Sequence, residues 1–356
     1  MFAPAIWAGV SYLVIPHRRI EPTTKNRWFW AAAYGAAGLL GGFIVPSAIP
    51  KLISLITNPS LPSALPQPTS TQQPLLWDRL FPNPTYAPGI LLGLVQAVLP
   101  LIVLLLILAW KQKINLDLWQ KLSVAGSLLA FLVVGLVISV KIGGGSNLHN
   151  LDMFLIGLLF TAWLVWEKGG NQYLEQLGKI PWYSLILLIL LILMPVYPAL
   201  LVQKPPVYPP YESAVSALKD IRDYVDEYKN EGEILFIDNR QLLTFGYISD
   251  VPLVPEYEKK VLMNEAMAED AVYFEQFYED LRQKRFRLII TEPLVIKFQG
   301  DEYHFGNEND AWVKWVAIPL TCYYEPIETF TEAGVMLLTP RETVLRDWQI
   351  CSQFLD

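Results

Sequence analysis

The chain has 356 residues, of which 53% are hydrophobic and 17% are charged, and its mean hydropathy is +0.32. These values exclude a disordered chain and a purely water-soluble domain, because soluble domains average about a quarter charged residues. The net charge of −7 is divided unevenly. Residues 1–202 carry 12 Lys+Arg and 6 Asp+Glu, a balance of +6. Residues 203–356 carry 15 Lys+Arg and 28 Asp+Glu, a balance of −13. This division predicts a membrane domain followed by an acidic, water-exposed domain.

The predicted membrane domain contains several apolar runs. A helix needs about 20 apolar residues to cross a bilayer core of about 30 Å. The runs near 28–49, 87–110, 118–140 and 180–202 meet this length, and those near 2–15 and 148–166 are shorter. The run 2–15 has no positive charge before it, unlike a signal peptide, and we interpret it as the end of a span whose beginning is missing. A short re-entrant or interfacial helix is the alternative. The sequence predicts an α-helical polytopic membrane domain of about six spans.

Basic residues in the short loops indicate the orientation, since they accumulate on the cytoplasmic side. The loops predicted on one side of the membrane, with the residues flanking them, contain nine basic residues: Arg18, Arg19, Lys25, Arg27, Lys111, Lys113, Lys121, Lys168 and Lys179. The opposite set contains three: Lys51, Arg79 and Lys141. The N-terminus and the C-terminal domain are therefore predicted to be extracytoplasmic. Every Asn-x-Ser/Thr triplet has Pro at x, which is consistent with an integral protein of a bacterial inner or plasma membrane.

Residues 203–210 form a Pro-rich, extended linker, and residues 211–356 are predicted to be an α/β domain. Apolar residues recur at helical spacing over 214–225, 266–284 and 311–318. Short apolar runs predict strands at 234–237 and 287–291, and a closing hairpin is predicted from 323–330 and 335–339. This alternation is typical of a small α/β layer.

The two cysteines, Cys322 and Cys351, both fall in the predicted outer domain. In an oxidising compartment they can form one disulfide, which closes the loop between these two positions. Two buried free thiols are the alternative.

Acidic residues offer few candidates for chemistry. Asp238 and Glu292 each follow a predicted strand, where α/β folds place their sites, but turns also favour acids and we give them no catalytic role. We interpret Glu265, Glu269 and Asp270 as a solvated helix face, and no metal site is predicted.

One loop between two spans stands out, the segment from Lys141 to Asp152. Consecutive glycines allow a close backbone approach, and their N–H groups can form an anion-binding nest. Asp152 can cap the following helix. The alternative is a flexible turn in which Lys141 snorkels. The candidate substrate-binding residues of this loop are Lys141, Gly143, Gly144, Gly145, Ser146, Asn147, His149 and Asn150.

The pattern Lys-x-Gly…Ser-Asn…Asn-x-Asp in this loop resembles that of bacterial membrane glycosyltransferases of the GT-C superfamily, in the group of protein mannosyltransferases and aminoarabinose transferases. Residues 232–246 and 285–290 are similar to the C-terminal domains of that group. The resemblance implies transfer of a hexosyl or pentosyl group from a polyprenyl-phosphate donor at the outer face, with no other cofactor. It implies that Lys141 neutralises the phosphate, that Asn147 and Asn150 orient phosphate or sugar, and that His149 donates a hydrogen bond.

The chain also departs from that superfamily, which has roughly twice as many spans and a catalytic acid in its first outer loop. Here the first complete outer loop holds only Asp78, which does not correspond to that acid. We therefore expect the C-terminal half of such an enzyme, truncated or working with a separate N-terminal half, and inactive alone. Its expected partners are a lipid-linked sugar and membrane lipids, and no nucleic acid.

Two other functions are compatible with the sequence. The first is a non-enzymatic, membrane-anchored module whose outer domain binds a protein or an envelope glycan. The second is a transporter, which the sequence favours less because the centres of the spans lack acidic residues.

Overall fold

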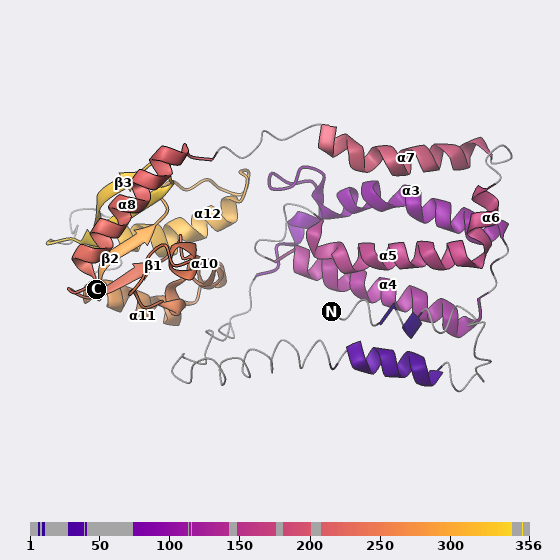
Figure 1. The fold of residues 1–356 in the computed structure, drawn as a ribbon, viewed down its shortest axis with the longest axis horizontal. Helices are drawn as coiled ribbons and strands as arrows, with labels where there is room; N and C mark the ends of the chain where they lie inside the picture. The colour runs from indigo at the N-terminus through magenta and orange to yellow at the C-terminus, as the bar shows by residue number, and fades with distance from the viewer. Residues whose placement is uncertain are drawn as a thin grey trace. The chain divides into compact units, whose positions relative to one another are not determined.

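The computed structural model describes residues 6–7, 9–10, 28–38, 40, 74–112, 114, 116–141, 148–175, 181–200, 208–343 and 351. By its contacts the chain divides into two compact units (Figure 1). A helical unit comprises Met1–Ser63 and Leu75–Gln203, and a C-terminal unit comprises Ala64–Pro74 and Lys204–Asp356.

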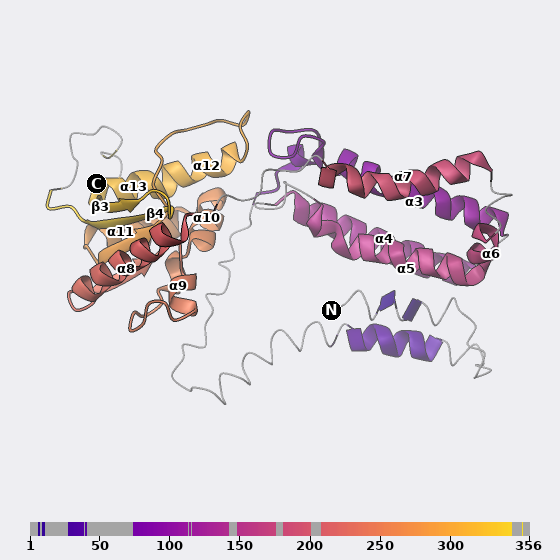
Figure 2. The ribbon, with the colours of Figure 1, turned by 45° about the horizontal axis from the view of Figure 1, so that its top comes forward.

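Four long helices form most of the described part of the helical unit: α3 (Gly89–Lys111), α4 (Leu118–Ser139), α5 (Asp152–Val165) and α7 (Trp182–Leu200); residues 28–38 are also helical. Shorter pieces are η1 (Trp77–Leu80), η2 (His149–Leu151), the π-helix η3 (Trp166–Gly170) and α6 (Asn171–Leu174). Successive long helices run in opposite directions, and α7 packs on α3 (Figures 1 and 2). The start of α3, the end of α4, the start of α5 and the end of α7 therefore share one end of this unit, which we call the loop end.

Apolar composition explains these helices. In the described part of the chain, three helical stretches are long and apolar enough to cross a membrane: α3, α4 and the run His149–Gly170. In α7 the stretch Trp182–Met194 is also apolar but shorter. Of the predicted spans near 2–15 and 28–49, the structure describes helix at 6–7, 9–10, 28–38 and 40, and their other residues lie outside the described part of the chain.

The helical unit buries a core between α3 and α5. Ile90 and Leu94 of α3 pack against Leu151 and Phe154 at the start of α5, with every one of these side chains buried. This core lies next to the loop end and fixes the first turns of α3 and α5 relative to each other.

A four-stranded mixed sheet in the order β1-β2-β4-β3 forms the centre of the C-terminal unit. Its strands are β1 (Glu233–Phe236), β2 (Phe286–Thr291), β3 (Tyr324–Phe330) and β4 (Val335–Pro340). β1 and β2 are parallel, whereas β4 is antiparallel to both β2 and β3. Its helices are α8 (Tyr211–Tyr228), α9 (Gln241–Thr244), η5 (Pro255–Tyr257), α10 (Lys259–Ala268), α11 (Ala271–Arg282), α12 (Gly306–Trp312), the π-helix η6 (Val313–Ala317) and α13 (Ile318–Tyr323).

Helices cover both faces of this sheet. Ile221 and Val225 of α8 pack on one face, and α10 to α13 pack on the other (Figure 2). The register between β1 and β2 shifts between Glu233 and Ile234, where Arg287 is the extra residue on β2. This bulge explains why Phe286 and Ile289, three residues apart, both face the α10–α13 side.

The predicted helix at 214–225, both predicted strands and the closing hairpin are confirmed. The single helix predicted over 266–284 is wrong, because two helices meet there. Glu269 ends α10 in the left-handed region, and the Asp270 carboxylate caps α11 by accepting a hydrogen bond from the Tyr273 N–H at 3.0 Å. The helix predicted over 311–318 is longer and extends across α12, η6 and α13.

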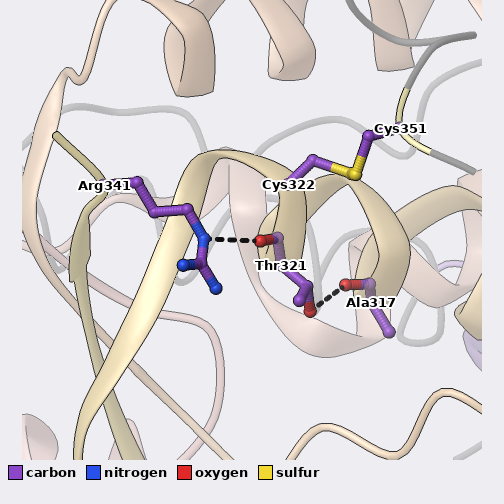
Figure 3. The surroundings of a disulfide bond; sticks show 5 residues. All are labelled: Ala317, Thr321, Cys322, Arg341 and Cys351. Carbon is purple, nitrogen blue, oxygen red and sulfur yellow. Dashed lines mark hydrogen bonds between the residues drawn. A yellow bond between two sulfur atoms is a disulfide. The ribbon is translucent and has the colours of Figure 1, made fainter. Parts of the chain in front are cut away.

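The two cysteines form a disulfide, which decides between the two alternatives left open by the sequence. Cys322 of α13 bonds to Cys351, and both are fully buried (Figure 3). The Arg341 Nε donates to the Thr321 carbonyl at 3.0 Å, and the Thr321 hydroxyl donates to the Ala317 carbonyl at 2.9 Å. The bond fixes the C-terminal segment to a helix that is itself held in the core.

Candidate functional site

The candidate loop lies at the loop end of the helical unit. Lys141 follows the end of α4 and is half-buried, His149 begins η2 and is exposed, and Asn150 is half-buried. The other candidates, Gly143, Gly144, Gly145, Ser146 and Asn147, lie outside the described residues. The structure therefore brings the three described candidates to one end of the unit.

A second segment, residues 74–88, contacts the start of this loop. The Leu76 N–H donates to the Val140 carbonyl at 2.7 Å, and the Arg79 Nη1 donates to the Lys141 carbonyl at 3.2 Å. Arg79 is buried, with only 2% of its surface exposed. The carbonyls at a helix end have no partner within the helix, so this segment caps α4. Sequence reasoning counted Arg79 only as a loop charge, because a contact between residues so far apart in the chain leaves no local pattern.

The far end of the loop is fixed by a glycine of α4. A Cβ built on Gly135 would lie 2.9 Å from the Asn150 carbonyl oxygen and 3.2 Å from the Leu151 Cα. Both neighbours are backbone atoms, so η2 can pack this closely only because residue 135 has no side chain. Nothing in the sequence distinguished this glycine from Gly126 of the same helix.

Asp152 does not cap α5 as the sequence predicted. Leu151 occupies the cap position, and no side chain there accepts a capping hydrogen bond. Asp152 is instead the first residue of α5 and is exposed. At that position its carboxylate interacts favourably with the positive end of the helix dipole.

The loop end gathers groups that can bind an anion. Arg79 supplies a guanidinium, Lys141 an ammonium and His149 an imidazole; the Arg79 side chain contacts the Lys141 backbone at the end of α4, and η2, which holds His149, packs on α4. Such groups form strong hydrogen bonds to phosphate oxygens. Asp78 of η1 and Asp152 are exposed carboxylates at this same end.

A second polar cluster lies at the carboxyl ends of β1 and β2. Lys259 Nζ donates to Asp238 Oδ2 at 2.9 Å and to Glu292 Oε2 at 2.6 Å. Burial lowers the pKa of Lys259, but its hydrogen bonds to Glu292 and Asp238 outweigh this and raise the pKa above its ordinary value. A lysine held in its charged form acts as an ion bridge and not as a base. The two acids therefore have a structural partner, Lys259, which the sequence did not indicate.

The three acids interpreted as a solvated helix face have different environments. Glu265 is buried, with 4% of its surface exposed, which corrects that interpretation. Glu269 forms an ion pair with Lys314 at 3.2 Å, and Asp270 is the cap of α11. In the described part of the chain, no group of three or more His, Cys, Asp or Glu residues is arranged to hold a metal ion.

The C-terminal unit also has a hollow of about 420 Å³ beside β1. It lies between the start of this edge strand, at Ile234, and the segment 250–256. Arg285 lines it and donates to Glu233 at 2.9 Å and to Asp280 at 2.7 Å. The hollow is bounded by an edge strand, by apolar residues and by charged groups of both signs.

No family model matches this chain, and neither a curated protein nor a solved structure matches it. The function is therefore inferred from the geometry of the loop end and of the C-terminal unit.

Proposed function

We propose that this chain is a membrane protein that binds the phosphate of a lipid-linked sugar at its loop end and takes part in glycosyl transfer from a polyprenyl-phosphate donor. The observation that carries the proposal is the packing of Arg79 against the backbone of Lys141, with His149 at the same end of the unit. A cation, Lys141, whose backbone is held by a buried arginine next to an apolar helix bundle, matches an anionic group attached to an apolar chain.

Each of these residues has one role in the proposed reaction. A departing polyprenyl phosphate gains negative charge as the bond to the sugar breaks, and Lys141 stabilises that charge. Asn150 and His149 donate hydrogen bonds to the phosphate or to the sugar hydroxyls. In the same step the anomeric carbon of the sugar forms a bond to the acceptor oxygen, and the proton of the acceptor hydroxyl passes to solvent.

We also propose that the loop end is extracytoplasmic and that the complete membrane domain has about six spans. Lys111, Lys121 and Lys168 lie at the opposite end of α3, α4 and α5, which favours a cytoplasmic location for that end. α7 ends at the loop end, and the C-terminal unit follows α7 in the sequence. The disulfide in that unit is typical of an oxidising, extracytoplasmic compartment. Two independent observations thus support one orientation.

The experiment measures binding of farnesyl phosphate to the full chain in lipid nanodiscs, with farnesol as the ligand that lacks the phosphate. Lys141→Ala is expected to weaken farnesyl phosphate binding about tenfold, the effect of losing one hydrogen bond to a charged group, and to leave farnesol binding unchanged. The same variant is expected to reduce sugar transfer strongly in a reconstituted system that is complete.

Lys121→Ala is the matched control, because it removes the same charge from the first turn of α4, at the opposite end of the same helix. Its farnesyl phosphate affinity should equal that of the unmodified chain. Equal affinities for the Lys141→Ala and Lys121→Ala variants would remove the loop from the binding site.

The alternative function, a membrane-anchored module that binds a protein or an envelope glycan, is favoured by the hollow beside β1. An edge strand has unpaired backbone groups, which can bind an extended peptide. If the unmodified chain does not bind farnesyl phosphate but retains an envelope peptide or glycan, and Leu253→Asp in the hollow abolishes that retention, this alternative replaces the first proposal.

A further inference from the structure

We propose that Arg79 is a positioning residue for the anion site, and that it acts through Lys141. This inference rests on the proposed function, and it adds that a segment distant in the sequence controls where the Lys141 cation is placed.

The first step is the burial of Arg79. Only 2% of its surface is exposed, although a guanidinium loses favourable hydration when it leaves water. A buried arginine is kept in place by its hydrogen bonds, and one of these goes to the Lys141 carbonyl at 3.2 Å. Its geometry is therefore coupled to the backbone of Lys141.

The second step is the position of that carbonyl. α4 ends at Ser139, and the Lys141 N–H still donates to the Ile138 carbonyl at 3.1 Å, in the last turn. The Lys141 carbonyl lies beyond that turn, where the helix supplies no donor. A positive group at a helix C-terminus is also favoured by the helix dipole. Arg79 thus satisfies the carbonyl at the point where the chain leaves the helix and enters the loop.

The third step is the second contact from the same segment. The Leu76 N–H donates to the Val140 carbonyl at 2.7 Å, one residue before Lys141. Together the two bonds fix two successive peptide groups. The direction of the Lys141 side chain follows from this backbone, so loss of the Arg79 bond releases the cation from its place without removing it.

A double-mutant cycle on farnesyl phosphate affinity tests this inference, with the full chain in nanodiscs. Arg79→Gln is expected to lower the affinity about tenfold when Lys141 is present, and less than twofold when Lys141→Ala is already in place. Arg79→Lys, which keeps the charge and can still donate to the Lys141 carbonyl, should retain the affinity within about threefold. Farnesol affinity should not change in any of these variants.

Each outcome has one meaning. Additive effects of Arg79→Gln and Lys141→Ala would show that Arg79 acts on the phosphate directly, and they would overturn the positioning role. Equal loss of farnesol and farnesyl phosphate binding would show a purely structural role and would also overturn it. If Arg79→Gln does not fold, Arg79→Met, which likewise removes the charge and the donors, takes its place in the cycle. If Lys141→Ala alone leaves the farnesyl phosphate affinity unchanged, the proposed function itself is refuted. That result differs from each of the outcomes above, which concern only the role of Arg79.

Discussion

Removal of the Cys322–Cys351 bond is expected to destabilise the C-terminal unit substantially. The bond closes a loop of 29 residues, and the chain entropy that it removes from the unfolded state corresponds to about 3.6 kcal/mol. For a unit of this size, a loss of that magnitude lowers the unfolding midpoint by roughly 10 °C.

The variants are Cys322→Ala, Cys351→Ala and the pair together, in the full chain in detergent. Unfolding of the C-terminal unit is followed by its susceptibility to protease as the temperature rises. Both single variants should lose nearly as much stability as the pair, because either one abolishes the cross-link. In the unmodified protein the fully buried bond should resist reductant until the unit unfolds.

The single variants also separate the cross-link from packing. If the effect arose from the lost side-chain volume, the pair would lose about the sum of the two single losses. A midpoint in the paired variant within about 2 °C of the unmodified protein would refute the entropic reasoning.

Two further predictions concern a glycine and a lysine. Gly135→Ala should lower the stability of the helical unit by about 1–3 kcal/mol and weaken farnesyl phosphate binding, because the new methyl group meets the Asn150 carbonyl. In Gly126→Ala the new methyl group meets nothing within 4 Å, so this control should be neutral in the same thermal and binding assays. Equal effects of the two substitutions would contradict the close approach of η2 to Gly135. Lys259→Gln should destabilise the C-terminal unit by about 1 kcal/mol in urea unfolding. Because the pKa of Lys259 is raised in the folded state, the charged side chain stabilises that state at neutral pH. This contribution should be lost as the pH rises above 10.5, the ordinary pKa of a lysine. The variant, which has no lysine at this position, should not show this loss.

Local patterns predicted the elements of the C-terminal unit well. The alternation of apolar and charged residues in α8, and the short apolar runs of β1 and β2, identify a helix with one buried face and two strands buried on both faces. The break between α10 and α11 also had a local signal, since Asp270 is a good cap, but the helical spacing on both sides concealed it.

The residues that shape the candidate site could not be predicted in this way. Gly126 and Gly135 are both glycines in one apolar helix, and only the tertiary packing of η2 makes one of them necessary. Arg79 resembled an ordinary loop charge, although it is among the most buried charged residues that the structure describes. In each case the partner is distant in the sequence or depends on a neighbouring helix, so no spacing rule applies.

The charge distribution explains why these local contacts matter more than the overall charge. Residues 203–356 carry a balance of −13, which on its own would repel an anionic ligand. At physiological ionic strength, however, exposed charges act on a ligand only over a Debye length of about 8 Å. Groups that are buried or half-buried are screened much less, and at the loop end these include Arg79 and Lys141. Under the proposed function, the affinity for a phosphate at this end then depends on how firmly Arg79 holds the backbone of Lys141.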